Sequence, residues 1–141
     1  MKMIRAILMY GSKCRIIDAI KKLTPKLLIT SDFKLAEISS HEHDLIHIYD
    51  NPLILEKNID LIIPQNINYI VIDLQGFTSL SHGLALNIAR RIVGILKGLC
   101  VVRGIKLVIL SPARARIGRS IVPAFPVHDV NDEIINLNNT A

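Results

Sequence analysis

The sequence predicts one α/β fold, with a mixed, largely parallel sheet and helices packed on it, and two observations carry that prediction. Short apolar runs such as Tyr69–Leu74 and Ile105–Leu110 have the length and composition of buried strands. They alternate with segments whose apolar residues repeat at helical spacing, above all Gly83–Gly98. Strands that alternate with helices favour helices layered on a sheet. A chain of 141 residues, half of them apolar, can bury one such core.

The same two periodicities assign the remaining elements. Leu53–Leu55 is expected to return from the preceding strand as a hairpin, and the Arg-rich stretch after Ser111-Pro112 is expected to be helical. In chain order we expect strands at Met3–Tyr10, Lys26–Thr30, Asp44–Tyr49, Leu53–Leu55, Tyr69–Leu74, Ile105–Leu110 and Ala124–Val127. Helices are expected from Ser12 to about Leu23, over Leu35–Ser40, Glu56–Ile63, Gly83–Gly98 and Ala113–Ile121, and from Asp129 or Asn131 through Leu137.

The domain organisation has two possible forms. Residues 1–43 predict a strand, a helix and a strand, an N-terminal βαβ extension placed before a domain of residues 44–141. The alternative is one continuous domain over residues 1–141.

The composition excludes several classes of protein. Charged residues make up 21% of the chain, which excludes wholesale disorder. The apolar runs are far shorter than the roughly 18–20 residues of a membrane span, and Ala6–Met9 is too short for a signal-peptide core. Cys14 and Cys100 suit a reducing compartment in which neither needs a partner. We therefore expect a cytoplasmic protein without a membrane span.

The last two thirds of the chain carry a resemblance. Its residues are Tyr69–Gly76 (YIVIDLQG), the loop FTSLSHG, the long helix, the strand IKLVILSP and the segment FPVHDVNDEII. In this order they resemble the STAS domain, the module shared by sulfate transporters and anti-sigma factor antagonists. The resemblance implies a non-enzymatic interaction module in bacterial regulation. Its expected partner is an anti-sigma factor, a kinase-like protein or another STAS protein.

The resemblance also implies a phosphorylation switch at a helix N-terminus, and here the sequence departs from the family. The family's Asp-Ser pair is missing. Without a gap Ser81 stands at the Asp position and His82 at the Ser position, whereas a one-residue deletion gives Ser81 the Ser position. A phosphate at a helix N-terminus meets unpaired N–H groups and adds about −1.5 to −2 charges. Ser81 can equally be an ordinary N-cap. The expected partner-binding residues are Thr78, Ser79, Ser81, His82 and Gly83.

A basic segment offers a second hypothesis. Residues 81–119 carry eight Lys or Arg and no Asp or Glu, in a chain of net charge +5. Arg114, Arg116 and Arg119 could neutralise phosphates of a nucleic acid or a nucleotide, and binding would then weaken with salt. The stretch has no aromatic residue for base stacking, and a solvated basic face is the simpler interpretation.

Other chemistries find less support in the residues. A degenerate receiver-like domain could use Asp73 as phosphoryl acceptor, but the chain lacks the acidic pair that holds Mg²⁺. Ser81 and His82 lack the frame of a hydrolase nucleophile. Gly11-Ser12-Lys13 lacks the glycine-rich frame of a phosphate loop and is interpreted as a strand-to-helix turn. We expect no metal, because no cysteine or third well-placed ligand supports His41, His43 and His47. We also expect no cofactor. Apolar edge strands would permit a homo-oligomer.

Overall fold

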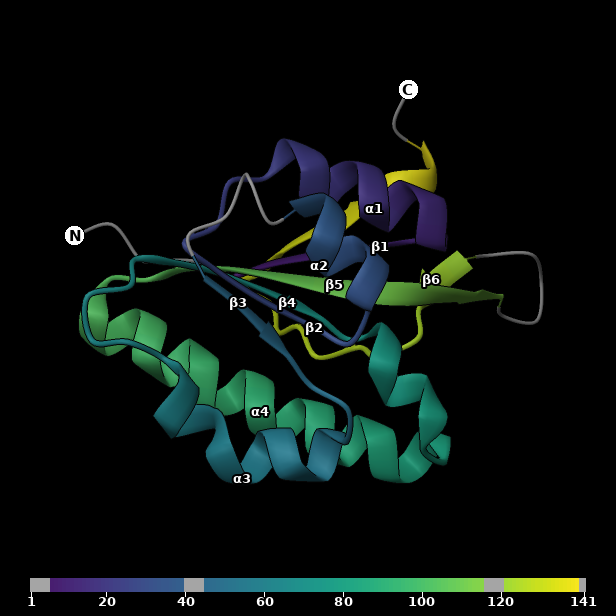
Figure 1. Cartoon of the computed structure of the whole chain (residues 1–141). Helices are drawn as coiled ribbons and strands as arrows, with labels where there is room; N and C mark the ends of the chain where they lie inside the picture. The colour runs from purple at the N-terminus through teal and green to yellow at the C-terminus, as the bar shows by residue number, and fades with distance from the viewer. Residues whose placement is uncertain (1–5, 40–44, 116–120, 140–141) are drawn as a thin grey trace.

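The computed structural model describes residues 6–39, 45–115 and 121–139, which form a sheet with helices on both faces (Figure 1). The strands are β1 (Ile7–Gly11), β2 (Leu27–Thr30), β3 (Leu45–Ile48), β4 (Tyr69–Asp73), β5 (Lys106–Ala115), β6 (Ile121–Pro123) and β7 (Glu133–Asn136). The α-helices are α1 (Lys13–Lys22), α2 (Phe33–Ser39), α3 (Pro52–Ile62) and α4 (His82–Arg103). Two 3₁₀ segments are η1 (Gln75–Ser79) and η2 (Leu137–Asn139).

The strand order in the sheet is β3-β2-β4-β5-β1-β7, and every neighbouring pair along this path is parallel. Strand β6 pairs antiparallel with the far end of β5. The predicted mixed, largely parallel sheet is therefore confirmed. Strands from the first 43 residues lie inside it, since β1 sits between β5 and β7 and β2 sits between β3 and β4.

Two apolar layers cover the sheet, one on each face. Helices α3 and α4 pack on one face, where alternate strand residues such as Ile70 and Ile72 meet them. Helix α1 packs on the other face against Val71 and Val108, with α2 beside it (Figure 1). Strands that are apolar on both sides need this double cover, and all four residues of β2 are accordingly buried.

Helix α3 replaces the hairpin that Leu53–Leu55 was expected to form, and that prediction was wrong. Asn51 caps the helix, because its side chain accepts a hydrogen bond from the Leu53 N–H at 2.9 Å. Pro52 follows in the first helical position, where its missing N–H costs nothing. The cap and the proline begin one helix that includes both predicted segments.

The expected basic helix Ala113–Ile121 was wrong at Ala113–Ala115 and at Ile121, and residues 116–120 lie outside the described residues; the expected edge strand Ala124–Val127 was also wrong. Strand β5 continues through Ala115 and pairs with β6, with Arg114 opposite Val122. Cross-strand pairing here overrides the helical preference of alanine and arginine. The expected C-terminal helix through Leu137 is instead β7, which pairs with β1, followed by η2.

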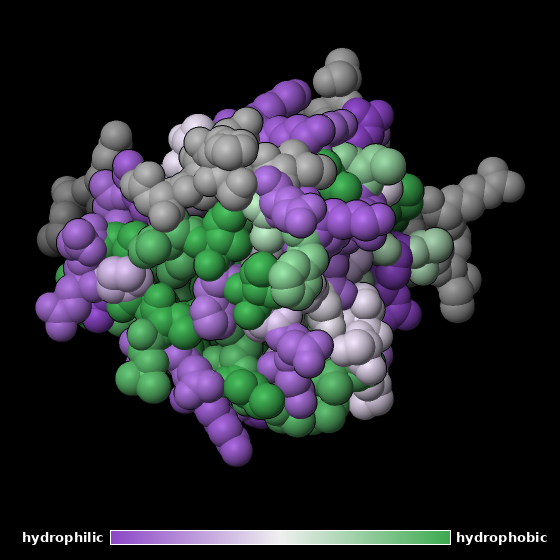
Figure 2. Space-filling model, in the orientation of Figure 1, coloured by the Kyte–Doolittle hydropathy of each residue, from purple (hydrophilic) through white to green (hydrophobic). Residues whose placement is uncertain are grey.

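Strand β3 is one edge of the sheet and exposes apolar side chains. Leu45 and Ile48 on β3 are exposed, as are Leu53, Ile54 and Leu61 on α3. Figure 2 shows apolar side chains gathered over this part of the molecule. Unpaired apolar edges favour association, so a homo-oligomer stays a prediction. Within the described ranges, no helix has the length and apolar character needed to cross a membrane.

Candidate functional site

The strand order creates a crevice at the carboxyl edge of the sheet. After β2 the chain enters α2, which lies with α1 on one face, whereas after β4 it enters η1 and then α4 on the opposite face. Because β2 and β4 are neighbours, the chain departs to opposite sides at their adjoining ends. In open α/β sheets, ligands bind outside the carboxyl ends of strands at such a switch point.

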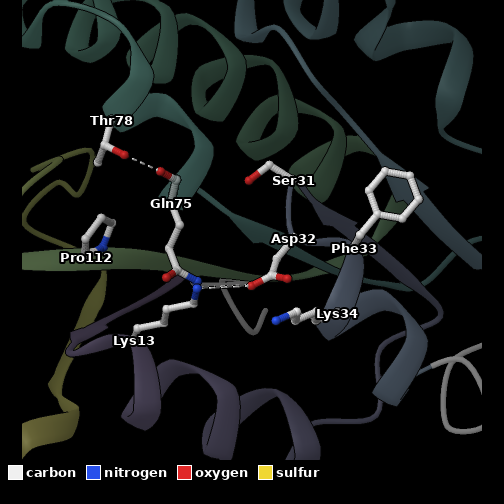
Figure 3. A pocket seen from close by; sticks show the side chains of 8 residues that line it. All are labelled: Lys13, Ser31, Asp32, Phe33, Lys34, Gln75, Thr78 and Pro112. Carbon is white, nitrogen blue, oxygen red and sulfur yellow. Dashed lines mark hydrogen bonds and ion pairs between the residues drawn. The ribbon is translucent and has the colours of Figure 1, made fainter.

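A cavity of about 610 Å³ lies at this switch point, within the size range of small-molecule sites. Figure 3 shows its lining, in which Lys13, Gln75 and Asp32 point toward one another. The α1 start and the segment after β2 contribute Lys13, Ser31, Asp32, Phe33 and Lys34. The segment after β4 contributes Gln75 and Thr78, and β5 contributes Pro112. We call this cavity the switch-point crevice.

The crevice combines both signs of charge. Lys13 Nζ lies 3.7 Å from Asp32 Oδ2, and the lysine side chain is 68% exposed whereas the aspartate is 19% exposed. The Asp32 backbone N–H donates to Thr30 Oγ1 at 3.2 Å, which holds the turn after β2 in place. Asp32 is thus a positioned carboxylate with an exposed cation beside it.

Asp73 forms a buried network directly behind the crevice. Its carboxylate accepts hydrogen bonds from Thr30 Oγ1 at 2.9 Å, from the Gln75 N–H at 3.0 Å and from Gln75 Nε2 at 3.2 Å. Burial raises the pKa of the Asp73 carboxyl; these hydrogen bonds oppose the rise and the nearby Asp32 charge adds to it. Tyr49 Oη donates to the Asp73 carbonyl oxygen at 2.6 Å. The network ties the ends of β2 and β4 together, but Asp73 itself is fully buried and faces no solvent.

The predicted partner-binding residues, from Thr78 to Gly83, are all exposed, whereas Leu80 between them is partly buried against the core. Thr78 Oγ1 donates to the Gln75 carbonyl at 2.7 Å, and Ser79 Oγ donates to the Gly76 carbonyl at 2.9 Å. Ser81 is the N-cap of α4, yet its side chain makes no capping hydrogen bond. The Thr78 and Ser79 hydroxyls are therefore held by backbone carbonyls of η1, whereas the Ser81 hydroxyl makes no capping bond to α4. Gly83 is exposed on the first turn of α4.

The predicted residues His82 and Arg114 do not line the crevice. Arg114 Nη1 is 3.3 Å from His82 Nε2, so β5 brings together two residues that the sequence assigned to different hypotheses. Arg116 and Arg119 lie outside the described residues, as do His41 and His43. Among the residues that are described, no three His, Cys, Asp or Glu side chains form a group that could hold a metal.

The sequence interpretation missed most of the crevice. It considered Lys13 only as part of a turn and Asp73 only as a receiver acceptor, and it did not consider Ser31, Asp32 or Gln75. A usable signal was present, because polar residues follow the predicted strands ending at Thr30 and Leu74 directly. Parallel strands place such residues at one edge, but their neighbours depend on the strand order.

No protein-family model matches the sequence, and no curated protein matches it either.

Proposed function

We propose that the protein is a ligand-binding domain whose switch-point crevice takes a nucleoside mono- or diphosphate. The observation that supports this most strongly is the position of Asp32, Lys13 and the exposed Phe33 ring around one cavity at the switch point. The sequence suggested the basic segment of residues 81–119 for a nucleotide, whereas this proposal places the nucleotide at the carboxyl edge of the sheet.

Each part of a nucleotide has a counterpart in the crevice. A carboxylate that follows the second strand can accept hydrogen bonds from both hydroxyls of a ribose, and Asp32 stands there. Lys13 and Lys34 supply positive charge for phosphate. The Phe33 ring, 71% exposed, offers a flat apolar surface for a base. The Gln75 side chain adds an amide to the lining.

The turn before α1 limits the number of phosphates. Ser12 alone separates β1 from α1, and its N–H already donates to Asn138 Oδ1 at 3.1 Å. A Cβ on Gly11 would lie 3.0 Å from Leu137 Cβ, so the turn is packed against η2. A turn this short, with its N–H group already hydrogen-bonded and its glycine packed on η2, does not wrap a triphosphate. Phosphate is therefore held mainly by lysine charge, and binding should weaken as ionic strength rises.

Calorimetric titration with ADP and with 2′-deoxy-ADP tests this function. We expect Asp32→Asn to weaken ADP binding about tenfold or more, because a hydrogen bond to a charged group contributes about 1.5–3 kcal/mol. The loss should be smaller for 2′-deoxy-ADP, which has one ribose hydroxyl fewer. Lys13→Met should weaken both ligands and reduce the salt dependence. Asp60→Asn, an exposed aspartate on α3 across the sheet, is the matched control. No saturable ADP binding, or equal binding by Asp32→Asn, would refute the proposal.

A second candidate function is regulatory protein–protein interaction through residues 78–83, as the family resemblance implies. Ser81 favours it, because this exposed N-cap residue of the 22-residue helix α4 makes no capping hydrogen bond with its side chain. A phosphate on Ser81 would lie beside the unpaired N–H groups of the first turn of α4 and change the charge offered to a partner.

Affinity capture from the natural host, with partners identified by mass spectrometry, tests this second function. We expect Ser81→Asp to lose a specific partner that the unmodified protein retains, and phosphopeptide analysis to find Ser81 modified. Ser12→Ala and Ser12→Asp are matched controls, because Ser12 is likewise an exposed N-cap serine without a side-chain capping bond. Identical partners for every variant would exclude the switch.

A further inference from the structure

A second cavity, of about 540 Å³, lies beyond the carboxyl end of β1 and between β5, β6 and the start of α4. Of the residues that the structure describes, none lines both this cavity and the switch-point crevice. Its apolar walls are Val122, Pro123, Ala124, Pro126 and Ile134. We call it the β6 cavity.

The polar groups of the β6 cavity are neutral or basic. They come from Tyr10, His82, Arg114 and His128, and among the described residues that line the cavity none is acidic. Arg114 makes no ion pair with an acidic side chain of the described residues; its polar contact is the one with His82. His128 Nδ1 is buried and has no hydrogen-bond partner in the described part of the chain. A guanidinium beside apolar walls, with no carboxylate of the described residues paired to it, favours an acidic ligand.

The walls of the β6 cavity are held in position by the surrounding structure. The His82 ring stacks on the Phe125 ring, with centroids 5.9 Å apart and planes at 20°. Phe125 is itself buried, and its N–H donates to Ser111 Oγ at 3.1 Å. Lys97 Nζ donates to the Val127 carbonyl at 3.1 Å and so fixes the segment between Pro126 and His128. A preformed cavity loses less conformational entropy when a ligand binds.

We infer that the β6 cavity binds an organic monocarboxylic acid with a compact apolar body. Arg114 pairs with the carboxylate, and His82 holds the guanidinium at the cavity mouth through their 3.3 Å contact. The apolar body packs on Val122, Pro126 and Ile134. A nucleotide suits this cavity less well than an apolar acid, since it would place a polar sugar against apolar walls.

Titration with benzoate and with benzamide, followed by amide NMR shifts, tests the inference. The two probes have nearly the same shape and differ in charge. We expect benzoate to bind saturably, with shifts at His82, Arg114 and Val122, and to bind at least about tenfold more tightly than benzamide. Arg114→Gln should remove most of that preference while the spectrum stays folded. Arg103→Gln, an exposed arginine at the opposite end of α4, should leave it unchanged.

Two outcomes would overturn the inference. One is equal binding of benzoate and benzamide, or benzoate binding that Arg114→Gln does not weaken. The other is displacement of benzoate by ADP at the same residues, which would assign the β6 cavity to the nucleotide. Failure of the nucleotide proposal is distinguishable, because Asp32→Asn should alter ADP binding and leave benzoate binding unchanged.

Discussion

Replacing Phe77 with alanine is expected to lower the free energy of unfolding by about 3–5 kcal/mol, the usual range for removing a buried aromatic ring. Phe77 is fully buried in η1. Its ring makes edge contacts with Tyr49 at a centroid distance of 5.6 Å and with Phe125 at 6.0 Å. Alanine would leave a cavity between these two rings. Urea denaturation followed by far-ultraviolet circular dichroism measures the effect.

Phe33→Ala is the matched control for this prediction. It makes the same chemical change at a ring that is 71% exposed, and we expect a change within about 0.5 kcal/mol. If the two variants were equally stable, Phe77 would not be the anchor that its burial indicates. The loss at Phe77 also has a functional meaning, since Tyr49 borders the Asp73 network and Phe125 supports His82. Phe77→Ala should therefore disturb the switch-point crevice and the β6 cavity together.

Strands that are buried on both faces could be predicted from the sequence. Tyr69–Asp73 and the first half of β5 are continuous apolar runs, and burial is the only environment that suits them. Helix α4 was similarly clear, because its apolar residues repeat at helical spacing over many turns. In these elements the local pattern and the tertiary environment agree.

The elements predicted wrongly are those in which tertiary pairing decides. Ala113, Arg114 and Ala115 have no strand preference of their own and become a strand through pairing with β6. Strand β7 is half exposed and pairs in parallel with β1, which lies more than 120 residues earlier in the chain. The start of α3 is different: Asn51-Pro52 is a helix-start signal, but the residues after it were expected to form the return strand of a hairpin.

The candidate site also combines a feature that the local sequence predicts with one that only the tertiary structure determines. That polar residues follow β2 and β4 can be read from the sequence, but that these two strands are neighbours cannot. Strand β2 lies beside β4, although β3 and α3 separate them in the chain. The pairing depends on which strand edges form hydrogen bonds with each other across the whole sheet. Asp32 and Gln75 therefore gain their shared cavity from the topology.

Gly76→Ala is expected to cost about 1–3 kcal/mol, the usual penalty for adding a group where there is no room. A Cβ at this position would lie 2.5 Å from Ser31 Oγ, 2.6 Å from Ser31 Cβ and 2.8 Å from Tyr49 Cε2. Ser31 lines the switch-point crevice, and Tyr49 Oη donates to the Asp73 carbonyl. To relieve the clash, η1 must move away from the end of β2 or the Ser31 and Tyr49 side chains must shift. Urea denaturation measures the stability, and ADP titration measures the effect on the crevice.

Gly83→Ala separates this steric effect from the general effect of replacing glycine. A Cβ at Gly83 meets nothing within 4 Å, and the residue lies in the first turn of α4. Alanine there should leave stability unchanged or raise it by up to about 1 kcal/mol, because glycine is the poorer helix former. If Gly76→Ala behaved like Gly83→Ala, η1 would not pack tightly on β2, and the crevice would lack the rigid wall that selective binding of a nucleotide requires. If only Gly76→Ala lost both stability and ADP binding, the close approach of η1 to β2 would be what shapes the site.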